Sequence, residues 1–366
     1  MVLNTKRGGE ICSVIDEGVL NTESAADLRK WLLQNVRLRA VVRLPEETFK
    51  PNKINVRSSL LYMERLGIED VDLDLDYKVT FCDLESLGYT GSGEPIRGFR
   101  FDRLLQEAAD QILDQTHSDQ RSGYNWAAYD VQVQSIVGDQ TYRFDLKYWQ
   151  PDIRARINAL NIAGGRTIQN INTIATSRGI SPPAELYVDE DEGYALVVKA
   201  SSNISKFGEL VLGGDFIEKN VYDDYLESSD EAKQNFNIVK SGDILLASTG
   251  DGTLGKCCVY RSSAPAVADG HVTIIRVDPR TIDPDYLCDY LRVGFGARQI
   301  ERLFTGSTGL VELTPDHVDS IVVDVSKKLR QQKAESSKLR SKEKVYRDSV
   351  GAAENELANA RRAFSA

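Results

Sequence analysis

The first 64 residues alternate apolar and polar segments in the way that an α/β domain requires. Short apolar runs at residues 11–15, 39–44 and 57–64 predict three strands. Residues 22–35 carry apolar side chains at helical spacing, behind a helix-capping signature that begins at Asn21. The order strand, helix, strand, strand fits the closing edge of a doubly wound sheet. Such a sheet needs more strands, so they must come from another polypeptide, from an absent N-terminal half, or from an unusual fold.

Residues 65–180 alternate less regularly, and they predict a mixed connecting region. Aromatic and polar residues alternate over part of it, as they do in half-buried strands. The expected elements are a strand with a glycine-rich turn (residues 76–93), an amphipathic helix (101–116), half-buried strands (122–149), a helix broken at Gly164 and Gly165 (151–179) and a linker (180–187).

Residues 181–325 predict a β-rich unit with a helix inside it. Apolar runs at residues 244–247 and 257–260 are strand-like and flank a glycine-rich turn. Residues 283–304 carry apolar side chains at helical spacing, and the sequence VDSIVVDV at residues 318–325 predicts a closing strand.

Residues 327–366 carry a heptad pattern. They contain no proline and a single glycine, and their apolar residues recur in alternating steps of three and four. This pattern predicts a long helix that pairs with another helix. The alternative is a solvated amphipathic tail packed on its own domain. The positions expected to contact a partner helix are Leu339, Tyr346, Val350, Leu357 and Phe364.

The composition is typical of a globular protein, with 41% hydrophobic and 27% charged residues among 366. This length predicts two or three structural units. No apolar run is long enough for a membrane span, and the N-terminal residues lack the apolar region of a signal peptide, so we expect a cytoplasmic protein without a membrane partner. Five irregularly spaced cysteines without a CxxC pair predict neither a disulfide framework nor a zinc site, and no metal ligands are assigned.

The charge is unevenly distributed. The formal net charge of −10 does not by itself indicate nucleic-acid binding. Residues 325–366 nevertheless contain eleven Lys and Arg against five Asp and Glu. Because a global charge can hide a local basic face, the acidity weakens a DNA-binding interpretation without excluding it.

The turn between residues 247 and 257 is the strongest candidate for a binding site. Three glycines allow the backbone to take positive φ and to approach a ligand closely. Short hydroxyl, carboxylate and ammonium side chains between them can reach phosphates and base edges. No convincing nucleophile–base pair is present, so we expect recognition and assign no catalytic residue. The alternative is a hairpin whose polar residues only satisfy the turn. The candidate DNA contacts here are Thr249, Gly250, Asp251, Gly252, Thr253 and Lys256.

Further candidates lie outside this turn. His271 could contact a base or act as an acid–base group, although a lone histidine that enters a strand more often packs or donates a hydrogen bond. Thr305, Ser307 and Thr308 belong to a TGSTG turn at a helix C-terminus, where glycine is expected for structural reasons, and contact with the DNA backbone is the second interpretation. Turn formation after a strand is sufficient to explain the carboxylate of Glu17.

Two stretches resemble known families. The sequence from DEGVL to SSLLYMER, with its best matches at residues 16–20 and 44–49, resembles the end of the methyltransferase domain in type I modification subunits and related N6-adenine methyltransferases. Residues 240–325 and the helix after them resemble the target recognition domain and helical spacer of type I specificity subunits.

The resemblance implies an organisation and a set of partners. It divides the chain into a partial Rossmann-like methyltransferase edge (1–64), a mixed connecting region (65–180), a β-rich target recognition domain (181–325) and a helical spacer or coiled coil (326–366), which is α/β plus α+β in class. It implies double-stranded DNA as ligand, and a methyltransferase subunit or a second copy as partner through the C-terminal helix.

Two family motifs are missing from this sequence. They are the Asn/Asp-Pro-Pro-Tyr/Phe tetrapeptide, which holds a flipped adenine, and the glycine-rich turn that holds S-adenosylmethionine. We therefore expect a chain that binds no cofactor and does not methylate alone, with S-adenosylmethionine belonging to the complete enzyme. The alternatives are the C-terminal part of a single-chain restriction–modification methyltransferase, or a protein-binding scaffold without DNA activity.

Overall fold

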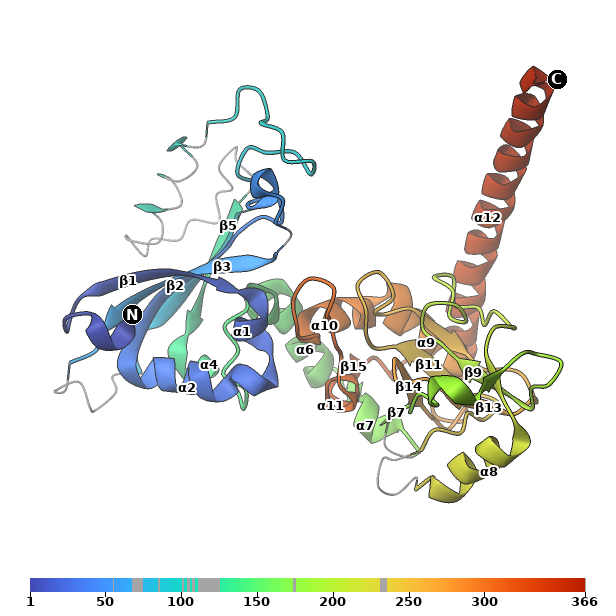
Figure 1. Ribbon diagram of the computed structural model, residues 1–366. Helices are drawn as coiled ribbons and strands as arrows, with labels where there is room; N and C mark the ends of the chain where they lie inside the picture. Colours follow the sequence, from blue (N-terminus) through green and yellow to red (C-terminus); the bar gives the residue numbers. More distant parts are fainter. Residues whose placement is uncertain are drawn as a thin grey trace. The chain divides into compact units, whose positions relative to one another are not determined.

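The computed structural model describes residues 1–54, 56–67, 75–84, 86–100, 102–103, 106, 109–110, 126–173, 176–230 and 236–365 (Figure 1). It shows two compact units of mixed α and β structure. Unit 1 comprises Met1–Ala155 and Glu301–Glu312, and unit 2 comprises Arg156–Ile300 and Leu313–Ala366. Most of the helix predicted at residues 101–116 lies outside the described residues.

Unit 1 is built on a five-stranded mixed sheet with the order β1-β3-β2-β4-β5. β3 is antiparallel to both β1 and β2, β4 is parallel to β2, and β5 is antiparallel to β4. β1, β2 and β4 therefore run in the same direction and end at the same edge. The strands are β1 (Glu10–Asp16), β2 (Val36–Arg43), β3 (Ser58–Arg65), β4 (Lys78–Leu84) and β5 (Trp126–Gln132).

The three strands predicted in the first 64 residues are present, but the sheet continues past residue 64 because β4 pairs with β2. Both faces of the sheet are covered. Val79 and Phe81 belong to the main core of unit 1, and Cys82 and Leu84 of the same strand belong to a smaller cluster on the other face. Figure 1 shows α2 lying along one face of the sheet.

The helices of unit 1 differ in two places from the predicted ones. Thr22 does not cap α2, because its hydroxyl donates to the carbonyl of Gly18 and closes α1 instead. The strand pattern of residues 122–149 ends at Gln132, and Phe144 and Trp149 reach the core from a loop and a short helix. The elements are η1 (Val2–Asn4), α1 (Glu17–Asn21), η2 (Glu23–Ala25), α2 (Ala26–Asn35), η3 (Lys50–Asn52), α4 (Val133–Val137), α5 (Leu146–Trp149) and the start of α6 (Pro151–Ile162).

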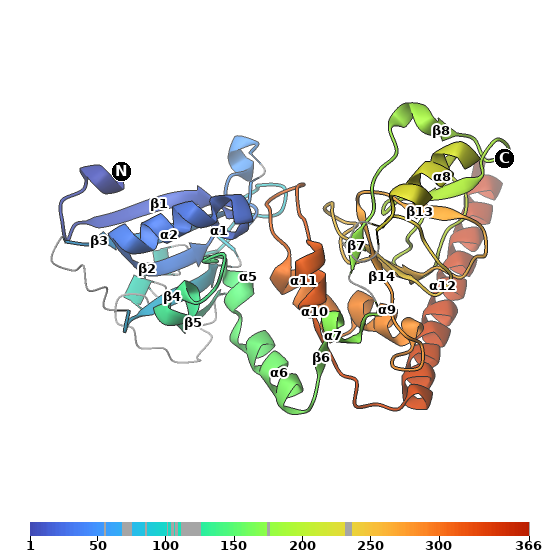
Figure 2. The ribbon, with the colours of Figure 1, turned by 90° about the horizontal axis from the view of Figure 1, so that it is seen from below.

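Unit 2 contains two four-stranded sheets, in agreement with the predicted β-rich segment (Figure 2). The first has the order β13-β9-β10-β8, and the second has the order β12-β11-β14-β7. A two-stranded sheet joins β15 to β6. The strands are β6 (Arg166–Thr167), β7 (Ser177–Arg178), β8 (Tyr187–Val188), β9 (Ala195–Val198), β10 (Phe216–Ile217), β11 (Ile244–Ala247), β12 (Cys257–Val259), β13 (Ala266–Ala268), β14 (Val272–Ile275) and β15 (Val322–Val323).

The helix predicted at residues 283–304 is two helices, α9 (Pro284–Val293) and α10 (Phe295–Leu303). Its start is as expected, because Asp283 caps the first turn by accepting from the amide of Tyr286. Gly294 takes an extended conformation and separates the two helices. The remaining helical elements of unit 2 are α7 (Ile168–Ile171), η5 (Ala184–Leu186), α8 (Lys219–Ser228) and α11 (Pro315–Asp319).

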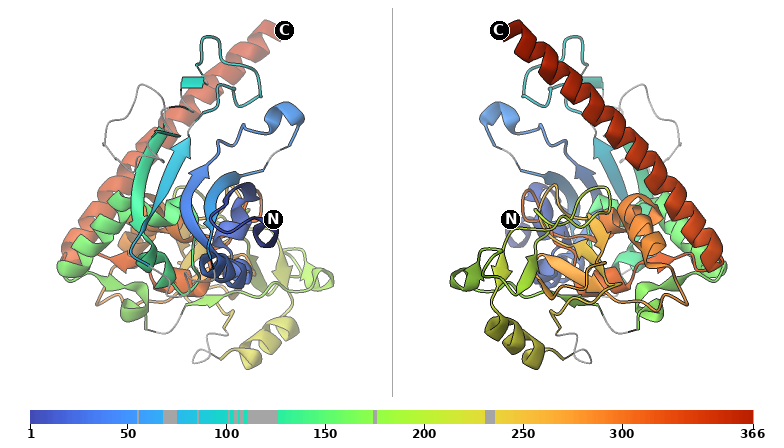
Figure 3. Two further views of the ribbon diagram at one scale, coloured as in Figure 1. Left: turned by 90° about the vertical axis from the view of Figure 1, so that its left-hand side faces the viewer. Right: turned by 90° about the vertical axis from the view of Figure 1, so that its right-hand side faces the viewer.

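The long C-terminal helix predicted from the heptads is present as α12 (Leu329–Ser365). Its first half packs on α9, which in turn packs on β12, and the buried Ser336 donates to the carboxylate of Asp289 on α9. Its second half projects from the rest of unit 2 (Figure 3), with Leu357 and Phe364 51% and 96% exposed. Pairing of this exposed seam with another helix stays a prediction. Among the described residues, no helix is both long and apolar enough to cross a membrane.

Candidate functional site

The predicted recognition turn joins two paired strands of unit 2. Leu246 of β11 pairs with Cys257 of β12, so residues 248–256 form the loop at that end of the hairpin. Gly250, Gly252 and Gly255 have φ angles of +87°, +84° and +84°. The prediction that these glycines take positive φ is confirmed, and any other residue would be strained at these positions.

Thr253 stabilises the turn from within. Its hydroxyl donates to the carbonyl of Thr249 at 2.6 Å and to that of Gly250 at 3.1 Å. A side chain at Gly250 would approach the same hydroxyl to 2.6 Å. These contacts agree with the alternative interpretation, in which the polar residues of the hairpin only satisfy the turn. Asp251 and Gly252 at the tip are exposed, and Lys256 is half-buried.

Thr249 instead points toward a residue from another strand. Its hydroxyl lies 2.6 Å from Nδ1 of His271, which is exposed at the start of β14. Sheet pairing explains the contact, because Ala247 is in register with Val272. Two candidates that are 22 residues apart are thus brought together.

A buried hydroxyl pair lies directly beneath this contact. The Ser248 and Thr273 hydroxyls are 2.5 Å apart, and both residues are fully buried. No sequence pattern predicted this pair, although each of its members is adjacent or close to a candidate residue. It ties β11 to β14 at the position from which Thr249 and His271 project.

The TGSTG candidates lie in unit 1. Thr305 and Glu312 exchange backbone hydrogen bonds of 2.8 and 2.9 Å and close a small hairpin. The side chain of Asn21 bonds both the amide and the carbonyl of Gly306, at 2.8 and 3.1 Å, and the hydroxyl of Thr308 accepts from the amide of Arg57 at 3.2 Å. Ser307 lies beside Gly18. The contacts of these residues are therefore structural ones within unit 1.

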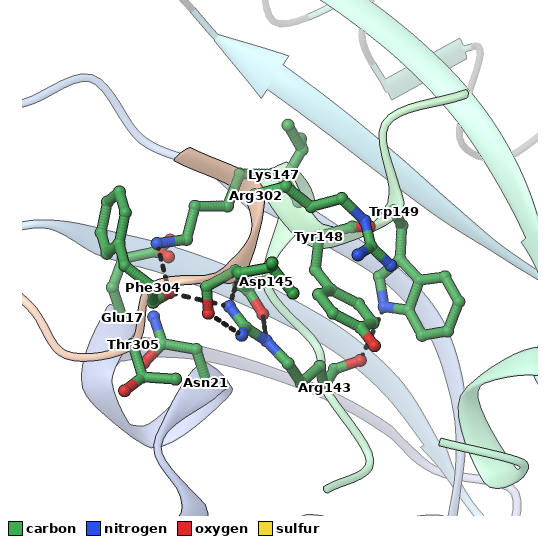
Figure 4. Close-up of polar contacts among 12 residues, drawn as sticks. Glu17, Asn21, Arg143, Asp145, Lys147, Tyr148, Trp149, Arg302, Phe304 and Thr305 are labelled. Carbon is green, nitrogen blue, oxygen red and sulfur yellow. Dashed lines mark hydrogen bonds and ion pairs between the residues drawn. The ribbon is translucent and has the colours of Figure 1, made fainter. Parts of the chain in front are cut away.

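A buried ion pair lies beneath this hairpin (Figure 4). Arg143 donates twice to the carboxylate of Asp145, at 2.7 and 2.6 Å, and both side chains are almost completely inaccessible. Arg143 also donates to the carbonyls of Leu303 and Phe304, at 2.7 and 3.1 Å. A charged fork therefore holds the hairpin through its backbone.

Lys147 follows the ion pair on α5. Its ammonium donates to the carbonyl of Phe304 at 2.8 Å and lies over the ring of the same residue. Among the described residues, no carboxylate lies within ion-pairing distance of it. Burial is the main cause that lowers the pKa of Lys147 to about 7.

Glu17 is the second buried titratable group beside the hairpin. Asp16 caps α1 as a turn residue would, but the side chain of Glu17 turns inward and accepts from the hydroxyl of Ser59. Burial raises its pKa, and the charge of Asp145 acts in the same direction. Turn formation alone therefore does not explain Glu17. No sequence signal joins it to Lys147, which is 130 positions away.

These groups line a pocket of about 650 Å³ at the edge where β1, β2 and β4 end. Among the described residues, no cluster of three or more His, Cys, Asp or Glu side chains suits a metal ion. The pocket is lined by Glu17, Asn21, Arg43, Leu44, Pro45, Glu46, Glu47, Arg57, Leu84, Lys147, Phe304 and Gly306.

Comparison with known proteins identifies no family model and no curated protein that matches this chain. Its structural neighbours are type I and type IIG restriction–modification proteins. The type IIG restriction endonuclease BpuSI is 9% identical over 92% of this chain and 42% of its own, with a TM-score of 0.38. A type I specificity subunit from M. genitalium is 14% identical over 48% of this chain and 37% of its own, with a TM-score of 0.32.

A modification subunit of a putative type I enzyme from Vibrio vulnificus YJ016 is 19% identical over 36% of this chain, with a TM-score of 0.27. The match covers 24% of that subunit, so this chain spans less than half the length of each of these three proteins. TM-scores below 0.5 establish no shared fold, and the function is therefore inferred from the chain's own residues.

Proposed function

We propose that this chain recognises a DNA target for a restriction–modification or related defence adenine-N6 methyltransferase, whose catalysis another polypeptide or an N-terminal half supplies. The observation that carries the proposal is the exposed Thr249–His271 pair at the end of a rigid hairpin. The resemblance of residues 240–325 to target recognition domains supports it from the sequence side.

The pair has the chemistry of a base-edge contact. With Nδ1 of His271 engaged by Thr249, the ring's Nε2 is available to donate or accept, depending on the tautomer. Threonine and histidine can both bond base edges or phosphates in a groove. The buried Ser248–Thr273 pair and the positive-φ glycines hold these groups in place, and such preorganisation reduces the entropy lost on binding.

Backbone contacts would come from the remainder of the turn. Lys256 neutralises a phosphate, and the exposed amides near Gly252 approach the sugar–phosphate chain closely. The excess of Lys and Arg on α12 adds attraction that is not sequence-specific. In this proposal the exposed seam of α12 binds a modification subunit or a second copy.

An electrophoretic mobility shift with random-sequence duplex DNA over a salt series tests the function. We expect binding at low salt whose affinity falls steeply as salt increases, because phosphate contacts release counterions. Absence of binding at low salt would contradict the proposal and would favour the protein-binding scaffold. Transfer of a methyl group by the isolated chain would contradict the assignment of catalysis to another polypeptide.

A further inference from the structure

The pocket of unit 1 shares no residue with the recognition turn of unit 2, and it has the location of a ligand site. Ligands of sheets with parallel strands bind outside the carboxyl ends of those strands. Glu17 directly follows β1, Arg43 ends β2 and Leu84 ends β4, and all three line the pocket. Its volume of about 650 Å³ lies within the usual range for small-molecule sites.

Three cationic side chains line this pocket, and they differ in the partners that their charges have. Arg43 donates twice to Asp83, at 2.7 and 2.6 Å. Arg57 pairs with Glu46 at 2.7 Å. Among the described residues, Lys147 has a carbonyl and an aromatic face as partners and no counter-charge in direct contact.

The nearest acidic groups, Asp145 and Glu17, attract Lys147 only from beyond ion-pairing distance. Burial raises the pKa of Glu17 itself. Asp145 attracts Lys147 but is itself occupied by Arg143, whose charge and that of Arg57 oppose protonation of Lys147. The cavity is lined by as many carboxyl groups as cations, and Lys147 is the cation that has no ion-pair partner in direct contact among the described residues.

Part of the cavity lining is apolar. The half-buried ring of Phe304 lies under the ammonium of Lys147, and Leu44, Pro45 and Leu84 are further apolar residues of the lining. A ligand with an anionic group at Lys147 could therefore place a planar or apolar part against Phe304.

We propose that this pocket binds the phosphate group of a phosphorylated ligand, with Lys147 as the residue that holds the anion and Arg43 and Arg57 at its rim. Phosphate carries the missing counter-charge and accepts several hydrogen bonds at once. Lys147 keeps one donor on Phe304 and offers the others to the ligand. The inference does not depend on the recognition turn, which belongs to unit 2.

The lowered pKa of Lys147, about 7, makes the binding dependent on pH. An anion favours the charged ammonium, so the bound ligand raises the pKa of Lys147 and a proton is taken up near neutral pH. Affinity should therefore be highest below the pKa of free Lys147 and should fall as the pH rises through it.

Inorganic sulfate is a suitable first probe, because its own charge is constant across this range. Calorimetric titration of the full chain at matched ionic strength in chloride should show affinity that falls roughly tenfold or more between about pH 6 and about pH 8.5. The K147M variant should bind sulfate weakly and without this pH dependence. Lys6→Met, which removes an exposed lysine of unit 1 away from the pocket, should behave like the wild type.

Three results would overturn the proposal: no sulfate binding, pH-independent binding by the wild type, or equal binding by K147M. Labelled-lysine spectra of the wild type provide a measurement that needs no variant to fold, since sulfate should raise the pKa of Lys147 and chloride should not. The phosphate could belong to DNA or to a free ligand, and two binding measurements distinguish these sources. If K147M weakens duplex binding, the phosphate is that of DNA. If duplex binding is unchanged and a nucleoside monophosphate binds, it is a free ligand.

Discussion

The recognition turn of unit 2 and the polar pocket of unit 1 place polar groups in opposite environments. The turn is exposed, and its contacts are formed by small side chains within about two dozen residues of one another. The pocket draws Glu17, Lys147 and Phe304 from distant segments, and the Arg143–Asp145 ion pair beneath the same hairpin is almost completely removed from water. An exposed hydrogen bond stabilises the fold little, whereas a buried charge that loses its partner destabilises it strongly.

The largest effect expected from this contrast is on the buried ion pair. R143M leaves the carboxylate of Asp145 buried without its partner and frees the hairpin carbonyls, so we expect a loss of about 3–5 kcal/mol in the free energy of unfolding. Urea denaturation measures it. Arg39→Met is the matched control, because its partner Glu64 and Arg39 itself are each about one-third exposed, and the loss there should stay below about 1 kcal/mol. Equal losses in the two variants would contradict the expected difference between a buried and a partly exposed ion pair.

The hairpin that covers the pocket provides the next test. Gly306→Ala would bring the new methyl group to 2.0 Å from the carbonyl oxygen of Leu310, at a φ of +96°. Gly309→Ala has a similar φ of +80° but no atom within 4 Å. We expect Gly306→Ala to destabilise by about 2–3 kcal/mol more than Gly309→Ala. Similar losses in the free energy of unfolding for both variants, by heat or urea, would show that the hairpin backbone is not packed closely at Gly306.

Lys147 should make the stability of the protein depend on pH. Its folded pKa of about 7 lies below the unfolded value near 10.4, so between these values the unfolded chain binds more protons. Its charge destabilises the fold below about pH 7, and this cost is relieved as the pH rises. The wild type should therefore gain up to about 1.4 kcal/mol per pH unit relative to K147M in this window. If the free energies of unfolding of the two proteins change in parallel across pH 7–10, Lys147 is not desolvated in the folded protein.

The smallest effect is expected at the turn, and it concerns binding instead of stability. T249V removes the hydroxyl that orients His271, and DNA affinity should fall about three- to tenfold, with the free energy of unfolding changed by less than about 1 kcal/mol. Thr173→Val is the control, since its exposed hydroxyl donates to the carbonyl of Arg276. Equal affinities of the T249V, T173V and wild-type proteins would remove Thr249 from the interface.

Local patterns predicted much of the fold but little of the pocket. The heptads predicted α12, and the glycines predicted the positive-φ turn, because both depend on spacing or on a single residue type. Thr22 was assigned to the start of the following helix, but its hydroxyl donates to the carbonyl of Gly18 in the preceding one. Both partners are local, so residue spacing alone does not decide between them. Glu17 looked like a turn residue because nothing in its neighbours reveals that it is buried.

By itself, the sequence determined where the strands of the first 64 residues, the recognition turn and the long helix occur, and which residues of that turn are polar. Only the tertiary structure decided that His271 reaches Thr249, that β4 extends the sheet beside β2, and that Lys147 has no acidic partner in direct contact among the described residues. The physical reason is range. Secondary structure follows from periodicity over a few residues, whereas these contacts join residues that are between 22 and 157 positions apart.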